Sequence, residues 1–517
     1  MQPWLRVSLL LCVFGFFREL RVSEPFVTEF LSGEWRDIEP EQLNRDVYPI
    51  GTYSQVALLV FMFLLTDVLR YKSIIVFSAC LGIVIWSLLL WTESLAALQV
   101  VQVLYGAYMA SEVAYYTYIY AKISREKYQQ VTGNTRAAIL LGRFLSGVIS
   151  QILVSTGAMN VRDLNYITLG TQAFSLLWSF FLPPVKTSVY FYSRDEDVKP
   201  TTGAVACDPD SQHQHEQQQQ SGNALEHSAE NALDVSYKFS TNESPDNSPC
   251  DQSKTIENGE LKDVPVATQP KARFSASRAV RLLWTHFISA YRQLPVVQWS
   301  LWWALAMAGF IQVQVYVQLL WHEIDQDQGT LFNGGAEALL TLLGAISALA
   351  AGYIANRIFE QWALWILTVC SGLQGGLIFY SGFATNIWVA YVLYILFGTL
   401  YLFMVTMASA IVAKYLEEDS FGLIFGINTF VAIGVQALLT LATISERGLM
   451  LDPRDQFKVY GGYFLALSII YLIAAIVASV SRQWPLRRKE ATATIPESSP
   501  APATTRCESM AVSGRME

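Results

Sequence analysis

The sequence predicts an all-α membrane protein whose chain crosses the bilayer about twelve times. Of its 517 residues, 52% are hydrophobic and only 15% are charged, which is a poor composition for the surface of a soluble protein. The apolar residues also come in blocks. Residues 73–91 (SIIVFSACLGIVIWSLLLW) carry no charge over roughly the twenty residues that span a hydrocarbon core. We therefore expect most apolar side chains to face lipid.

A hydropathy window of about nineteen residues locates the expected spans. In the first half they lie near residues 4–20, 50–66, 73–92, 95–121, 137–157 and 163–183. In the second half they lie near residues 296–321, 334–354, 362–381, 386–412, 421–444 and 460–480. Six spans, a long loop and six more spans predict a major facilitator-like 6+6 architecture, with a substrate held at mid-depth between the halves.

The first span has an alternative interpretation, because residues 8–17 (SLLLCVFGFF) resemble the apolar core of a cleaved signal peptide. No cleavage pattern of small residues follows. The apolar core is followed instead by the charged residues Arg18, Glu19 and Arg21. We interpret the segment as a transmembrane helix, so the expected N-terminal half covers residues 1–185 and the C-terminal half residues 293–483.

Two polar segments separate and follow the halves. Residues 186–292 include HQHEQQQQ and are rich in Ser, Asn, Asp and Lys, and residues 484–517 are rich in Ser, Pro and Thr. So few apolar residues cannot offset the entropy of ordering the chain. We expect residues 186–292 to be a disordered loop and residues 484–517 a disordered tail.

Basic residues near the span ends indicate orientation. The larger group follows the even-numbered spans and lies in the tail: Arg70, Lys72, Lys122, Arg125, Lys127, Arg136, Arg357, Lys414, Arg487, Arg488 and Lys489. The opposite loops hold fewer: Arg36, Arg45, Arg447, Arg454 and Lys458. We therefore expect both termini and the central loop on the cytoplasmic side.

Two of these loops carry related motifs at corresponding points of the halves. They are TDVLRYK (66–72) and GYIANR (352–357), in which an acid or amide precedes a base, as in both halves of major facilitators. Asp67, Arg70 and Arg357 are therefore candidate gating residues. Helix capping with positive-inside anchoring is an equally good interpretation of the same residues.

Charged residues inside spans point to the functional site, because each costs about 2.5 to 3.5 kcal/mol at mid-helix unless it faces water, a partner or a substrate. The candidates are Glu112, Arg143 and Glu337. Glu112 shares one helical stripe with four tyrosines, which are Tyr105, Tyr108, Tyr115 and Tyr116. A carboxylate among aromatic rings suits an organic cation. The alternative is an aromatic packing seam in which Glu112 pairs with Arg143.

Arg143 itself allows two interpretations. Its guanidinium could hold a carboxylate or phosphate of an anionic substrate through two hydrogen bonds. We favour the other interpretation, an ion pair between helices with Glu112 or Glu337 as the partner.

Enzyme chemistry finds no support in the sequence. The six cysteines form no C-x-x-C pair, only five histidines occur, and the motifs H-E-x-x-H and G-x-S-x-G and a phosphate-binding Gly loop are absent. We expect no enzyme, cofactor, metal site or disulfide. The expected partners are a small molecule and the lipid bilayer, without nucleic acid, and no filter-like loop indicates a channel.

Motifs in both halves resemble the reduced folate and thiamine transporter family, solute carrier family 19. In the first half they are SEPF (23–26), TYSQVALLVFMFLLTDVLRYK (52–72), EVAYYTYIY (112–120) and LNYITL (164–169). In the second half they are SLWWALAMAGF (300–310), YVQLLW (316–321), FNGGAEA (332–338) and FGINTF (425–430). The resemblance covers nearly all of both halves but not the loop or the tail.

The resemblance implies a secondary active vitamin carrier at the plasma membrane, most similar to thiamine carriers. Thiamine carriers of the family have an acid where folate carriers place an arginine, and here that position is Glu112 in EVAYY. By the same resemblance Glu24, Thr52, Tyr53, Tyr115 and Glu337 would join it around the substrate. Exchange with protons is also implied, with substrate and proton competing for the Glu112 carboxylate.

Three departures from the thiamine pattern keep other substrates open. Gly51 stands where a tryptophan is usual, and Ile311 and Val315 stand where asparagines are usual. Together with Arg143, these residues leave another cationic vitamin, such as a pyridoxine form, and a folate-like or other organic anion as alternatives. A non-transporting membrane receptor or scaffold, whose long loop recruits partners, is the alternative of another class.

Overall fold

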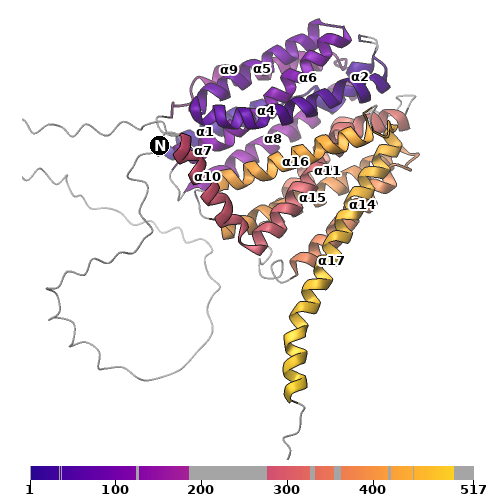
Figure 1. Cartoon of the computed structure of the whole chain (residues 1–517). Coiled ribbons are helices and arrows are strands. Elements are labelled where there is room, and N and C mark those ends of the chain that lie inside the picture. The colour runs from indigo at the N-terminus through magenta and orange to yellow at the C-terminus, as the bar shows by residue number, and fades with distance from the viewer. Residues whose placement is uncertain are drawn as a thin grey trace, which may run out of the picture. The chain divides into compact units, whose positions relative to one another are not determined.

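The computed structural model describes residues 2–33, 35–36, 38–123, 127–185, 276–325, 332–353, 362–416, 421–445 and 448–493. Over these ranges the chain forms helices joined by short turns, with no strand (Figure 1). The long helices of the first half are α1 (Pro3–Glu19), α4 (Tyr48–Val68), α5 (Lys72–Trp91), α6 (Leu95–Ala110), α7 (Glu112–Lys122), α8 (Tyr128–Ser155) and α9 (Leu164–Ser179). Those of the second half are α10 (Ala276–Tyr291), α11 (Leu294–Ile324), α12 (Asn333–Tyr353), α14 (Ala363–Ser381), α15 (Ile387–Tyr415), α16 (Phe421–Thr443) and α17 (Pro453–Ala493).

The expected spans coincide with these helices. Nine of the described helices are long and apolar enough to cross a membrane. The remaining expected spans fall on α1, with 17 residues, on α9, with 16, and on α6 and α7 together. The prediction of an all-α, multi-pass membrane protein is therefore confirmed.

Two expected boundaries of the polar segments are wrong. Helix α10 occupies the end of the expected loop, where Phe287 packs on Tyr291 at 4.8 Å between ring centroids, and the Tyr291 hydroxyl donates to Asn428 of α16. Helix α17 continues to Ala493, ten residues into the expected tail. Residues 186–275 and 494–517 lie outside the described residues, so the expected disorder there stays a prediction.

The fourth expected span is two helices rather than one. Helix α6 ends at Ala110 and α7 begins at Glu112. At the junction the Ser111 hydroxyl donates to the carbonyl oxygen of Tyr108, and the Ala114 amide donates to the oxygen of Ser111, three residues back. This tight turn places Glu112 in the first turn of α7.

Short elements connect α1 to α4 and fold inward. They are the 3-10 turn η1 (Glu24–Phe26), α2 (Val27–Ser32), α3 (Pro40–Gln42) and η2 (Leu43–Val47). Gln318 of α11 fastens this segment to the second half, since its side-chain oxygen accepts from the Thr28 amide and its nitrogen donates to the Glu24 carbonyl. Glu24 is thereby held near the second half.

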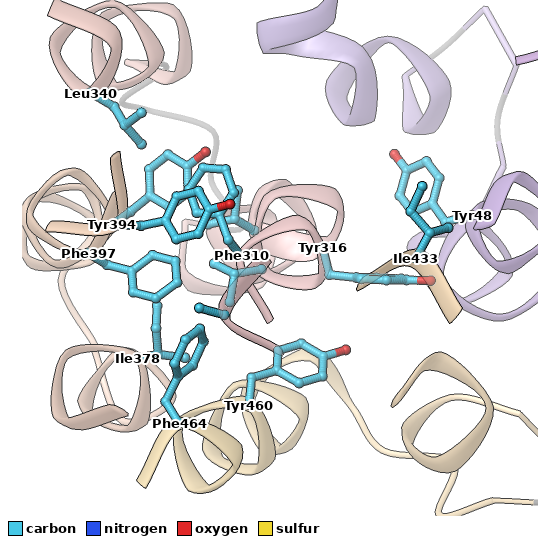
Figure 2. Packing of buried hydrophobic residues seen from close by; sticks show 14 of the residues in the cluster. Tyr48, Phe310, Tyr316, Leu340, Ile378, Tyr394, Phe397, Ile433, Tyr460 and Phe464 are labelled. Carbon is cyan, nitrogen blue, oxygen red and sulfur yellow. The ribbon is translucent and has the colours of Figure 1, made fainter. Parts of the chain in front are cut away.

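Aromatic side chains fill the interior of the second half (Figure 2). Phe310 stacks on Tyr401 at 4.0 Å and on Phe397 at 5.9 Å, and Phe397 meets Phe464 edge-on. Figure 2 also shows Tyr316 of α11 reaching Tyr48 of α4, with the ring centroids 6.0 Å apart. The apolar interior therefore continues from one half into the other.

The halves also meet through two helix pairs at corresponding positions, α4 with α16 and α8 with α12. At the second pair the backbones approach closely. A Cβ on Gly147 of α8 would lie 2.6 Å from the Gly334 carbonyl oxygen of α12, so only glycine fits there. The Gly335 amide donates to Gln151 of α8 next to this crossing.

Large apolar side chains such as Phe181, Leu349 and Val477 are exposed on the outside of the molecule, as a lipid-facing surface requires.

Candidate functional site

Five charged side chains form a cluster where α1 ends, and we call it the charged cluster: Arg18, Glu19, Arg21, Glu24 and Arg143. Glu19 is its centre. One carboxylate oxygen of Glu19 accepts from Arg18 at 3.1 Å, and the other accepts from Arg21 and from Nε of Arg143, both at 2.8 Å. The Glu19 side chain is 1% exposed, so this carboxylate is stabilised by the guanidiniums rather than by water.

Glu24 lies at the edge of the charged cluster, on η1. Its carboxylate accepts from Arg21 at 2.5 Å and from the Tyr105 hydroxyl of α6 at 3.0 Å. Its side chain is 35% exposed, in contrast to the buried Arg21. Glu24 and Tyr105, both predicted from the sequence, are thus brought together.

Glu112 lies beside the charged cluster at the start of α7. A carboxylate oxygen is 3.8 Å from Nη1 of Arg18, a long contact, and the side chain is 21% exposed. Arg18 has closer partners, because its guanidinium lies 4.5 Å from the Tyr108 ring centroid and donates to the Tyr108 carbonyl. The Glu112 carboxylate is therefore near a positive charge without being tied to it.

The four predicted tyrosines divide into two environments. Tyr108 and Tyr115 are buried and pack against α1, and the Tyr115 hydroxyl donates to the Leu11 carbonyl. Tyr105 and Tyr116 are half-buried. The break at Ser111 separates α6 from α7, and the four tyrosines of the expected stripe do not share one environment. Tyr105 and Tyr116, which precede and follow Glu112 in the sequence, keep part of their aromatic surface accessible.

Glu337 comes from the second half, on the first turns of α12. Its carboxylate accepts from the Tyr394 hydroxyl of α15 at 2.8 Å, and its side chain is half-buried. Gly334, one turn earlier on α12, is the residue that crosses α8 at Gly147. Glu337 therefore lies close to the contact between the halves.

Thr52 and Tyr53 do not share one environment. Thr52 is buried in α4, whereas Tyr53 is 38% exposed. Successive residues of a helix point about 100° apart, so the two side chains face different surroundings.

The candidate gating residues are described only in part. The Tyr71 hydroxyl donates to Asp67 at 2.6 Å, and Arg70 and Tyr71 adopt positive φ angles of 60° and 61° in the turn that joins α4 to α5. The turn is therefore tight and its acid is buried. Arg357 lies outside the described residues, so a matching arrangement in the second half stays a prediction.

The predicted partners of Arg143 are wrong. Its described ion pair is with Glu19, instead of with Glu112 or Glu337. In the sequence Arg18, Glu19 and Arg21 stand as charges that flank the first span, yet in the structure each is less than 5% exposed. The signal that points to them is their density, three charges in four residues, separated from SEPF by Val22 alone.

The partly exposed charges define what this arrangement can bind. Arg18, Glu19 and Arg21 are buried, which leaves the carboxylates of Glu24, Glu112 and Glu337 and the guanidinium of Arg143 with accessible surface. Three acids and one base can receive an organic molecule with a positive group. Within the described ranges, no group of three or more His, Cys, Asp or Glu side chains could hold a metal ion.

Two packed halves that each contain six of the expected spans, with polar, ionisable side chains between them, define a multi-pass membrane transporter. Solved transporters share the fold. The nucleoside transporter NupG superposes with a TM-score of 0.52 at 12% identity over 91% of this chain and 99% of its own, and the human organic anion transporter MFSD10 (TETRAN) with 0.51 at 13% over 91% and 100%.

Sequence comparison narrows this class. The family model described as reduced folate carrier matches residues 2–459, and the chain belongs to that family. Mouse thiamine transporter 1 is 33% identical over 96% of this chain and 94% of its own. The human reduced folate transporter is 32% identical over 92% of this chain and 73% of its own. These nearly equal identities do not separate the two kinds of relative.

Proposed function

We propose that this protein carries thiamine across the plasma membrane as a secondary active transporter, with both termini in the cytoplasm. The observation that carries the proposal is the sign of the accessible charges, since Glu24, Glu112 and Glu337 outnumber Arg143. The acid at position 112 adds support, because the EVAYY motif resembles that of thiamine carriers. The similarity to mouse thiamine transporter 1, which extends over nearly the full length of both chains, supports the same substrate.

Glu112 is the residue proposed to bind the cationic substrate. Its carboxylate would accept hydrogen bonds from the aminopyrimidine of thiamine and face the thiazolium charge. Half-buried Tyr105 and Tyr116 would add aromatic contacts, worth up to about 2 kcal/mol when the cation is desolvated. Arg18 leaves the carboxylate available, because it is bonded more closely to Glu19 and Tyr108.

Alternating access would move the site between the two membrane faces. Glu112, Glu24 and Arg143 belong to the first half and Glu337 to the second, so a substrate between them contacts both. A proton could replace the cation on Glu112 during the return step, which couples uptake to proton exit by mutual exclusion. Uptake should then rise when the cell interior is more acidic than the medium.

A second candidate is a carrier of folate-like anions. The accessible guanidinium of Arg143 favours it, as does the human reduced folate transporter among the relatives. A non-transporting receptor or scaffold is the candidate of another class.

Uptake of labelled thiamine and labelled folate by cells that express the chain separates the three candidates. We expect thiamine uptake above that of untransfected cells, inhibition by excess unlabelled thiamine, and little inhibition by folate. Folate uptake without thiamine uptake would establish the anion carrier instead. Surface expression with neither activity would support the receptor or scaffold.

A further inference from the structure

We propose that Arg143 is a specificity-determining residue that receives an anionic group of the substrate, so that the preferred substrate is dipolar, with a cationic part and a phosphate or carboxylate. This inference rests on the proposed function and deepens it. The cationic part would face Glu112, and the anionic part would face Arg143.

The hydrogen bonding of Arg143 supports this role. A guanidinium offers five N–H donors, and Glu19 engages the one on Nε, at 2.8 Å. The side chain is 38% exposed, although Arg143 lies within α8 and is flanked by apolar turns. Glu19 thus holds the guanidinium at Nε, while more than a third of the side-chain surface of Arg143 stays exposed. Two terminal nitrogens in one plane match the oxygens of a phosphate or carboxylate.

The incomplete neutralisation of the Arg143 charge by its neighbours also supports an anionic ligand. Arg18 and Arg21 share the Glu19 carboxylate with Arg143, and Arg21 has Glu24 as a second acidic partner. One carboxylate shared by three guanidiniums compensates Arg143 only in part. Arg18 and Arg21 are also less than 5% exposed, so among the arginines of the charged cluster Arg143 is the one that a substrate can reach.

The position of Arg143 on α8 directs it toward the second half. Gly147, four residues later, lies on the same helix face and crosses α12 at Gly334. Glu24 belongs to the same charged cluster as Arg143, Glu112 lies beside that cluster, and Glu337 follows Gly334 on α12 by one turn. A simple anion would meet these acids, and a simple cation would meet Arg143. A dipolar molecule satisfies both signs at once.

The test compares labelled thiamine with labelled thiamine monophosphate, which adds an anionic group to the same cation. In the wild-type protein we expect the monophosphate to enter at least as efficiently as thiamine. Arg143→Met should lower the ratio of monophosphate to thiamine uptake at least about tenfold, the effect of losing a charge-assisted contact. Arg143→Lys should lower the ratio as well, because an ammonium keeps the charge but lacks the planar pair of N–H donors of a guanidinium.

Arg136→Met is the matched control, because Arg136 is an exposed arginine two turns earlier on the same helix. It should leave the ratio unchanged. A ratio of monophosphate to thiamine uptake that is unchanged in Arg143→Met overturns the inference, even where thiamine uptake is confirmed. If the Met variant does not reach the cell surface, the same result in Arg143→Lys overturns it. Strong preference of the wild type for thiamine over the monophosphate overturns it too.

Ligand-induced thermal stabilisation of the purified protein distinguishes this inference from the proposed function. Should cells take up no thiamine, the proposed function fails. Stabilisation by thiamine monophosphate or folate that Arg143→Lys removes would still support the anion contact. Stabilisation that is equal in the wild type and in Arg143→Lys, or absent from both, would overturn it.

Discussion

The carboxylate of Glu19 holds three arginines that would otherwise repel one another inside the membrane. Arg18 and Arg21 lie on the same chain segment as Glu19, and Arg143 is 124 residues from Glu19, on α8. Their common acceptor therefore fixes α1 to α8 as well as balancing charge. Gly142, next to Arg143, supports the same contact, since a Cβ there would lie 2.5 Å from the Phe16 carbonyl oxygen.

Replacing Glu19 with Gln should destabilise the protein more than replacing Arg143 with Met. Removing one partner of a buried ionic network costs about 3 to 5 kcal/mol, and the loss of Glu19 leaves three guanidiniums without their shared acid. Loss of Arg143 leaves Glu19 with Arg18 and Arg21. Thermal unfolding in detergent measures the difference. The double variant should recover part of the loss; additive effects would mean that the two side chains are not coupled.

Glu112→Gln should reduce thiamine uptake to near background while the protein still reaches the cell surface. The amide keeps the shape of the side chain and loses the charge, which at roughly 4 Å and an effective dielectric of about 20 contributes up to roughly 4 kcal/mol before desolvation. Glu93→Gln, an exposed acid before α6, is the matched control. Uptake by Glu112→Gln at close to the wild-type rate would remove Glu112 from the site.

At the residue scale the sequence predicted the carboxylates better than their partners. Glu112 and Glu337 stood out because charges inside apolar segments are costly. Glu19 did not, because a charge at the end of an apolar run looks the same whether it is solvated or folded inward. The partner of Arg143 depends on which helices pack together, and a single sequence does not contain that information.

Hydropathy predicts the helices more closely than the sequence predicts individual side-chain contacts, because the thickness of the bilayer sets the length of each span. Each of the twelve expected segments overlaps a described helix, and the fourth overlaps two. The break at Ser111 went unpredicted, since a serine that bonds back to Tyr108 leaves no proline or glycine signal at the junction. Helix α10 went unpredicted because its apolar residues lie beside a strongly polar loop.

Helices α8 and α12 approach each other closely where Gly147 meets Gly334. Gly147→Val should weaken the contact between the halves, because the added carbons would collide with the Gly334 backbone, and overpacking of this kind costs about 1 to 3 kcal/mol. Both the melting temperature and thiamine uptake should fall. Gly133→Val on the same helix has open space around its Cβ and serves as the control. Equal effects of the two substitutions would show that the crossing is not closely packed.

For the molecule as a whole, the polar loop between the halves should be dispensable for transport. Deleting residues 195–270 removes a segment whose composition cannot contribute to a site buried in the membrane. Thiamine uptake, normalised to surface protein, should stay within about twofold of the wild type, because the halves need a tether and not that sequence. A normalised loss of about tenfold or more would make the loop a functional part of the transporter.

In the proposed transport mechanism, the two halves alternately expose one site that binds thiamine. Counterflow in liposomes that contain the purified protein tests it most directly. With a high concentration of unlabelled thiamine inside, labelled thiamine outside should accumulate transiently above equilibrium, because a carrier returns loaded from either side. Counterflow driven by folate and not by thiamine would contradict the substrate, and labelled thiamine that only equilibrates, or does not enter at all, would contradict the carrier mechanism.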